Sequence, residues 1–413
     1  MRVALPLLLL ATLAACDRRR PAGEGPYDAR VREAIPQIEQ ATGLKFKTPP
    51  KLEVRSRAQV RDFLLTKFNE STPAEEMRGE EMAWKLFGLI PDSLQLRPFL
   101  LDLLTEQIVG YYDPQTKVLY VVEGAAEDMA GMVVSHELIH ALQDQYVNLD
   151  SIQKATGNSD RQAAAQAVME GHATYIQVKT SLGGEDISSR LPGGWEQMRE
   201  MIREGQTSMP MFSTAPMAIQ ESLIFPYLSG AEFIRRFEEY RPGKSPLDSL
   251  PVSTEQVLDL QAFFTGYDAP STVTLPGGPG LHEQVMGEFG TRLFVYQHTR
   301  NNSAAIGAAR GWDGDRYRVV QTPKGNALVW AIVWDSAVDA AQFVDAIGEG
   351  IGRRYRTPAP TQSANGVRTY TGATRTVVIT PREIGGRNVV LYVDVPTGVS
   401  PALLDPARIG IGG

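Results

Sequence analysis

The sequence predicts an α+β protein with a mainly helical domain over residues 27–303 and a small α+β domain with an antiparallel sheet over residues 304–413. Apolar residues in the first part recur mostly every three or four positions, which is the period of helices packed on a core. In the second part, short runs of β-branched and aromatic residues alternate with turn sequences, as antiparallel strands do. A chain of 413 residues is long enough for both domains.

The first fifteen residues have the form of a secretory signal peptide. One early charge, Arg2, precedes an apolar run from Val3 to Ala15 that only Thr12 interrupts. This run is too short to span a bilayer, which takes roughly 20 residues. We therefore expect residues 1–15 to direct export of the chain.

The end of that run, Leu-Ala-Ala-Cys at residues 13–16, resembles the signal of bacterial lipoproteins, in which cleavage precedes a cysteine that takes a diacylglycerol. Cys16 is the only cysteine, so it has no disulfide partner within the chain. The resemblance implies a lipid anchor at Cys16, a tether over residues 16–26, and a place in the bacterial cell envelope facing the periplasm or the exterior. Asp17 matches the residue that favours inner-membrane retention in lipoproteins of enteric-type bacteria. The alternative is an ordinary signal peptide followed by a chance cysteine.

Composition narrows the classes of partner. Apolar residues make up 43% of the chain and charged residues 22%, as in ordinary soluble globular domains. The net charge of −7 argues against a nucleic-acid partner.

The first elements of the helical domain lead to a hairpin. Apolar residues at helical spacing predict four helices, at residues 29–41, 57–69, 75–87 and 97–104. Alternation of apolar and polar residues predicts one strand, at residues 51–55. Two β-rich runs, residues 107–112 and 117–122, surround a polar turn that contains Pro114, which predicts a β-hairpin. One edge of this hairpin can pair with an extended peptide substrate, although a purely structural hairpin has the same sequence pattern.

The motif H-E-x-x-H at residues 136–140 lies on the next predicted helix, residues 125–146. Residues four apart on a helix lie about 40° apart around the axis and about 6 Å apart along it, so His136 and His140 can hold one ion. Glu137 lies about 100° around the helix from His136 and is placed to touch a water on that ion. Two nitrogen ligands and a carboxylate base are typical of a zinc hydrolase. The alternative is two buried histidines that each need a hydrogen-bond partner.

A catalytic zinc ion usually has a third protein ligand. Glu170 is the residue we select, because it follows His140 by 30 positions and lies on a second helical stretch at residues 160–178. Small residues on its face, with Gly171 beside it, are expected to let this helix approach the metal helix closely. The other candidates are His172, His282 and His298.

The segment 136–145, followed by Glu170-Gly171-His172-Ala173-Thr174, resembles the gluzincin class of zinc metallopeptidases. Within that class the chain is similar to poorly characterised bacterial secreted and lipoprotein members, which share the segments at residues 225–230 and 251–256. The resemblance covers roughly residues 101–312. It implies a zincin-like fold, one zinc ion held by His136, His140 and Glu170, and a peptide or protein substrate. Many members have an Asp where this chain has Thr174, so either a different partner orients the first histidine, His136, or that role is weaker.

The implied reaction is peptide-bond hydrolysis. A zinc ion lowers the pKa of its water toward 7 and polarises the scissile carbonyl, and Glu137 would transfer the proton to the leaving amine. Tyr227 is the residue that we expect to stabilise the oxyanion, with Tyr111 and His298 as alternatives. Two other functions fit the same motif: a non-catalytic zinc-binding scaffold of the envelope, and a zinc amidase acting on cell-wall peptides.

The rest of the chain divides at about residue 304. Residues 185–220 are loop-rich, and helices are predicted at residues 229–240 and 282–297, the second closing the helical domain. The C-terminal domain is predicted to contain a helix at residues 336–348 and five strands, at residues 316–321, 327–334, 367–370, 375–380 and 388–393.

Overall fold

The computed structural model describes residues 27–71, 73–153, 157–185, 197–199, 209–357, 359–363 and 365–412. The predicted signal peptide, Cys16, Asp17 and the tether lie outside the described residues. None of the described helices combines the length and the apolar character that crossing a membrane requires. The structure confirms a mixed α+β architecture with antiparallel sheets, one of them C-terminal.

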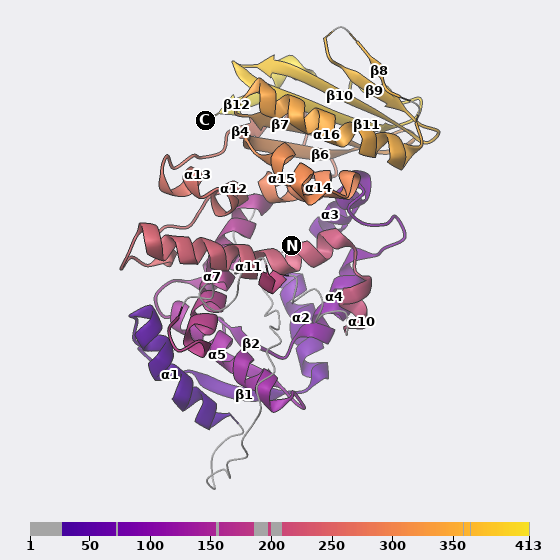
Figure 1. Ribbon diagram of the computed structural model, residues 1–413. Helices are drawn as coiled ribbons and strands as arrows, with labels where there is room; N and C mark the ends of the chain where they lie inside the picture. The colour runs from indigo at the N-terminus through magenta and orange to yellow at the C-terminus, as the bar shows by residue number, and fades with distance from the viewer. Residues whose placement is uncertain are drawn as a thin grey trace.

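Residues 28–264, which we call the helical lobe, contain most of the helices (Figure 1). These are α1 (Asp28–Thr42), α2 (Arg57–Ser71), α3 (Ala74–Phe87), α4 (Leu96–Gln107), α5 (Glu127–Gln143), α6 (Leu149–Gln153), α7 (Ser159–Ser181), α10 (Pro210–Thr214), α11 (Met217–Tyr240), α12 (Thr254–Leu258) and α13 (Leu260–Phe264). The helices predicted up to residue 178 are all present. The start predicted for α11 at Ser229 was wrong, because this helix begins at Met217 and continues through Pro226.

Polar side chains and glycines set several of these helix ends. The Asn158 side chain accepts a hydrogen bond from the Arg161 N–H and begins α7, and Ser253 caps α12 in the same way through the Gln256 N–H. Helix α3 ends at Gly88, whose φ of 76° is a left-handed conformation that glycine adopts without strain.

A three-stranded sheet lies beside α5. It consists of β1 (Lys51–Arg55), β2 (Gly110–Asp113) and β3 (Val118–Val122) in the order β1-β3-β2. The predicted hairpin is confirmed, since β2 and β3 pair antiparallel. β1 joins the other side of β3 in parallel. Of the two hairpin strands, only β2 therefore lies at an edge of this sheet.

Residues 272–412, which we call the C-terminal unit, form a seven-stranded antiparallel sheet and a two-stranded sheet (Figure 1). The large sheet has the order β5-β6-β7-β11-β10-β9-β8, and β12 pairs with β4. The elements are β4 (Thr272–Thr274), β5 (His282–Gln284), α14 (Gly287–Thr299), α15 (Asn302–Ala309), β6 (Trp312–Thr322), β7 (Gly325–Trp334), α16 (Ala337–Tyr355), β8 (Thr361–Gln362), β9 (Arg368–Thr371), β10 (Arg375–Ile384), β11 (Arg387–Pro396) and β12 (Gly410–Gly412). The five strands and the helix predicted there are confirmed.

The large sheet begins before residue 304, where the sequence pattern places the domain boundary. The single helix predicted for residues 282–297 was wrong: β5 pairs with β6, and α14 starts only after it. The break falls at Gly287, whose φ of 76° is disfavoured for other residues.

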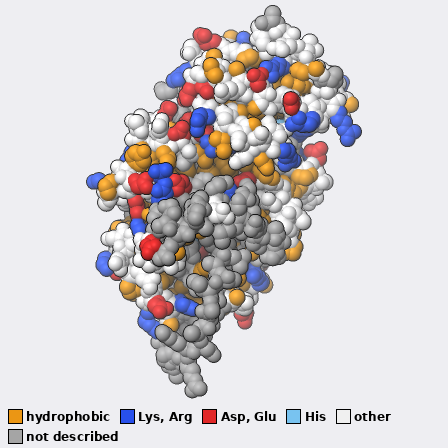
Figure 2. Space-filling model, in the orientation of Figure 1, with side chains coloured by type: hydrophobic (Ala, Val, Ile, Leu, Met, Phe, Trp, Pro, Cys, Tyr) orange, Lys and Arg blue, Asp and Glu red, His pale blue; other side chains and the backbone are white. Residues whose placement is uncertain are grey.

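Helix α3 connects the two parts. Phe87 at its end packs against Phe294 and Trp330 of the C-terminal unit, with ring centroids 5.7 and 5.2 Å apart. The core of the C-terminal unit is therefore completed by a helix from early in the chain. On the described part of the face in Figure 2, acidic and basic side chains are interspersed.

Candidate metal centre

Helices α5 and α7 bring three predicted ligands together. His136 Nε2, His140 Nε2 and Glu170 Oε2 lie 3.2 Å from one another in all three pairs. Zinc bonds of 2.0–2.1 Å at tetrahedral angles place neighbouring ligand atoms about 3.3 Å apart. His136 and Glu170 are 4% and 3% exposed, so the cluster lies inside the helical lobe.

Two glutamines set the orientation of the imidazoles. His136 Nδ1 lies 3.3 Å from Gln177 Oε1, and His140 Nδ1 lies 2.8 Å from Gln143 Oε1. The NH₂ groups of both amides donate to backbone carbonyls, of Met132 and Met169 respectively. Because the amide nitrogens are engaged there, the oxygens face the rings, and each Nδ1 must carry the hydrogen. In the neutral rings both Nε2 atoms then present lone pairs.

Two imidazole lone pairs and a carboxylate oxygen therefore converge on one point. Burial raises the pKa of Glu170, but the adjacent His140 and His136 lower it to about 2, so the carboxylate is ionised. Such a set of electron-pair donors needs a shared cation or additional protons to be stable in a buried site. The donors fit zinc, which binds imidazole nitrogen and carboxylate oxygen.

Glu137 lies next to this cluster and is 2% exposed. Its Oε2 accepts a hydrogen bond of 2.7 Å from the Tyr112 N–H of β2, whereas no described residue donates a hydrogen bond to its buried Oε1. Burial raises the pKa of this carboxyl group, against the lowering effect of His140 and His136. One oxygen is thus held in place, and the lone pairs of the other are not used by the described residues.

Tyr227 of α11 packs beside the cluster. Its ring centroid lies 5.9 Å from that of His136, and the side chain is 2% exposed. The structure thus brings Tyr227 beside one of the predicted ligands. The alternative Tyr111 is engaged elsewhere, because its hydroxyl accepts a hydrogen bond from Arg55 and its ring stacks on Phe63.

The remaining histidines do not join the cluster. His172 Nδ1 lies 3.1 Å from Gln143 Nε2 and accepts a hydrogen bond from it; burial, with His140 and Lys179, lowers the pKa of this side chain to about 4. His282 and His298 belong to the C-terminal unit, where they contact Tyr317 and the Phe87 carbonyl oxygen.

Sequence reasoning missed the two glutamines. Gln177 follows Glu170 by two helical turns and occupies the orienting role that Thr174 does not fill. Gln143 follows His140 by one turn, and this i, i+3 spacing was the available signal. Asp144, four residues after His140, accepts hydrogen bonds from the Tyr112 hydroxyl and from Lys117 and does not orient His140.

The close approach expected beside Gly171 involves a different helix. A Cβ on Gly171 would lie 2.1 Å from the carbonyl carbon of Gly230, and a Cβ on Gly230 would lie 2.0 Å from the Ala167 carbonyl oxygen. Helix α7 thus crosses α11 at a glycine pair, and its neighbouring residue Glu170 reaches His136 and His140 of α5, as expected. This crossing also sets the position of Tyr227, one turn before Gly230.

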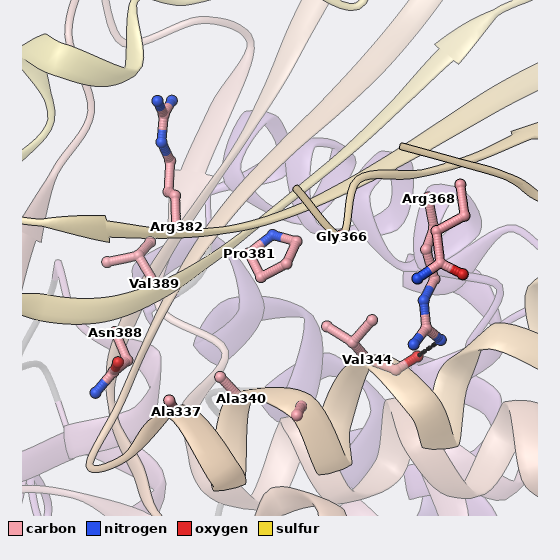
Figure 3. A pocket seen from close by; sticks show the side chains of 11 residues that line it. Ala337, Ala340, Val344, Gly366, Arg368, Pro381, Arg382, Asn388 and Val389 are labelled. Carbon is pink, nitrogen blue, oxygen red and sulfur yellow. Dashed lines mark hydrogen bonds between the residues drawn. The ribbon is translucent and has the colours of Figure 1, made fainter. Parts of the chain in front are cut away.

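A cavity of about 290 Å³ lies in the C-terminal unit (Figure 3). It lies between α16 and the sheet, and its lining includes Ala340, Val344, Pro381 and Arg368. None of the predicted site residues lines it.

Comparisons with known proteins concern the C-terminal unit alone. The model of a family described as a domain of unknown function (DUF8575) matches residues 274–399. No curated protein and no solved structure matches the chain. The matched residues exclude His136, His140 and Glu170, so this family carries no argument about the cluster.

Proposed function

We propose that the protein is a zinc-dependent metallopeptidase with a zincin-like helical lobe, anchored in the bacterial envelope through a lipid on Cys16. The observation that supports this best is the combination of three converging ligand atoms, 3.2 Å apart, with a buried Glu137 oxygen that has no hydrogen-bond partner in the described part of the chain. A purely structural zinc site has no need of such an oxygen, because its four ligands are closed.

The residues have distinct roles in this proposal. When bound, zinc supplies an acidic water and a Lewis acid for the scissile carbonyl. The Tyr112 N–H holds one oxygen of Glu137, so that the other accepts a proton and later donates it to the leaving amine. The edge of β2 binds the extended substrate backbone, and Tyr227 donates to the developing oxyanion.

Replacing Glu137 by Gln tests the proposal. Glutamine keeps an acceptor for the Tyr112 N–H but cannot take a proton, so peptide hydrolysis is expected to fall by about 10³-fold. Zinc content, measured by atomic emission on the purified protein, is expected to stay at the wild-type level. The exposed Glu123 after β3 provides the charge-matched control, Glu123→Gln, with unchanged activity.

Casein and peptidoglycan fragments serve as parallel substrates. Cleavage of casein that depends on Glu137 supports the peptidase, whereas cleavage of peptidoglycan fragments alone assigns the zinc amidase. A wild-type protein that binds zinc and cleaves neither is the scaffold. Activity that survives Glu137→Gln overturns the assignment of the base.

A further inference from the structure

The segment at residues 251–256 contains four consecutive buried polar residues that the proposed reaction does not use. Ser253, Thr254 and Gln256 are fully buried, and Glu255 is 6% exposed. Four polar side chains in a row are stable inside a protein only if each has a partner. Their partners therefore show what the segment does.

Three of these four side chains are satisfied within the protein. Ser253 caps the Gln256 N–H, and the Thr254 hydroxyl donates to Asp160 and accepts from the Phe289 N–H. The Gln256 side chain accepts from the Val252 N–H and donates to the carbonyl oxygen of Asp268. These contacts join α12 to α7, to α14 and to the loop that follows α13.

Glu255 is different. Among the described residues, no hydrogen-bond donor reaches its carboxylate, although the side chain is more than nine-tenths buried. It faces two further carboxylates: one oxygen each of Glu255, Asp268 and Asp335 lies within 4.8 Å of the other two. Asp268 and Asp335 are exposed, so the group opens to solvent on one side.

Neighbouring carboxylates make ionisation of Glu255 less favourable. Burial and then Glu288, Asp268, Asp335 and Asp313 raise the pKa of Glu255 to about 10. Burial and neighbouring aspartates raise the pKa of Asp335 to about 6. The positive charge of Arg387 lowers the pKa of Asp268 and of Asp335, but its guanidinium group donates its hydrogen bond to Asp313. A buried carboxylate without donors, next to two others, is a site that a cation would stabilise.

The geometry points to a second metal site, in which Glu255, Asp268 and Asp335 bind a calcium ion. Oxygen-only ligands select hard cations and disfavour zinc. Calcium, with bonds of 2.3–2.6 Å and a flexible coordination geometry, suits three carboxylates from separate segments better than magnesium, which requires near-ideal octahedral geometry at 2.0–2.1 Å. Water from the open side completes a coordination of six to eight oxygens.

The three ligands belong to three separate segments of the chain. Glu255 lies on α12 of the helical lobe, Asp335 follows β7 of the C-terminal unit, and Asp268 lies on the connecting segment. In Figure 1, α12 and α13 lie below the end of the sheet near β4. A bound ion thus ties the two parts together and stabilises the folded chain against unfolding.

Thermal unfolding of the zinc-loaded protein tests this site. After calcium removal on a chelating resin and reloading with zinc, CaCl₂ at a hundredfold excess over its dissociation constant is expected to raise Tm by about 3 °C. MgCl₂ is expected to raise it less. Calorimetric titration with CaCl₂ is expected to give one site per chain.

Two variants remove the site, and two others serve as controls. Asp335→Asn changes an exposed residue, and Glu255→Gln keeps the size of a buried one; both are expected to abolish the calcium shift while Tm without calcium stays unchanged or rises. Glu349→Gln removes an exposed carboxylate of α16 and is expected to keep the shift. Glu170→Ala, which removes a proposed zinc ligand, is also expected to keep it, so the calcium site is tested independently of the peptidase.

Two outcomes overturn the inference. One is a wild-type protein whose Tm and calorimetric titration do not respond to CaCl₂; Glu255 is then a buried neutral acid. The other is a calcium shift that persists in both Asp335→Asn and Glu255→Gln, which places the ion elsewhere.

Discussion

Buried carboxylates have opposite surroundings in the two parts of the molecule. Asp315 of the C-terminal unit is 2% exposed and accepts hydrogen bonds from the Met286 and Gly287 N–H groups and from the indoles of Trp312 and Trp330. Glu137 of the helical lobe is equally buried, yet no described residue donates a hydrogen bond to its Oε1. Burial of a carboxyl group is thus common to both parts, and the two side chains differ in whether both oxygens are satisfied.

The histidines of the two parts also differ in their surroundings. His136 and His140 have their Nδ1 atoms engaged by glutamines and turn both Nε2 atoms toward Glu170. His298 of α14 places its Nε2 3.3 Å from the Phe87 carbonyl oxygen and packs its ring on Phe294. The first two converge with Glu170 on one point, whereas the third takes part in the packing between α3 and the C-terminal unit.

The largest effect on stability is expected from Asp315→Ala. This change leaves four buried N–H donors without an acceptor, so the free energy of unfolding should fall by about 3 kcal/mol. Urea denaturation measures the loss, and zinc content of the folded protein should stay unchanged. Asp345→Ala, which removes an exposed partner of Arg368, should cost far less. Equal losses in the two variants would contradict a special role of the satisfied carboxylate.

An intermediate effect is expected from Gln177→Leu. Without the amide oxygen, the His136 ring loses the acceptor that fixes its tautomer, and zinc affinity should fall by about 10–100-fold. Competition with a chromogenic chelator measures the affinity. The matched control is Gln107→Leu, because Gln107 is also buried in the helical lobe but its Nε2 has no hydrogen-bond partner. A loss of affinity in Gln107→Leu as large as in Gln177→Leu would point to general destabilisation.

The smallest effect is expected from His298→Gln and depends on pH. Burial, with a contribution from Arg354, lowers the pKa of His298 from 6.5 to about 3. Between these values the unfolded chain binds a proton that the folded chain does not, so stability is lost as pH falls below 6.5. His298→Gln removes this contribution, which is about 1 kcal/mol between pH 7 and pH 5.5. Urea denaturation at both pH values measures it; identical pH dependence in wild type and variant would show that folding leaves the pKa of His298 unchanged.

The local elements were predictable because their signals lie in neighbouring residues. The spacing of apolar residues placed α5 and α7, and the spacing within residues 136–140 aligned two imidazoles on one side of a helix. The polar turn at Pro114 placed the hairpin. In each case the interactions that determine the local structure connect residues no more than four positions apart.

The contacts between distant segments were not predictable from one sequence. Nothing local indicates that β1 pairs with β3 in parallel, or that α3 completes the C-terminal core. Gln177 orients His136 only because α5 and α7 lie side by side, and Glu255 meets Asp335 only in the folded chain. Helix α11 was misjudged for another reason: Pro226 usually ends a helix, but packing on both sides maintains this one.

The glycine crossing of α7 and α11 has a consequence for protein engineering. Replacing a helical glycine by alanine commonly stabilises a protein, because alanine lowers the conformational entropy of the unfolded chain. At Gly171 and Gly230 this strategy fails, since an added methyl group would overlap the backbone of the facing helix. Gly307 of α15 is suitable instead, because a methyl group there meets no atom within 4 Å. Attempts to raise heat tolerance should therefore start on the periphery of the molecule and leave the helices around the cluster unchanged.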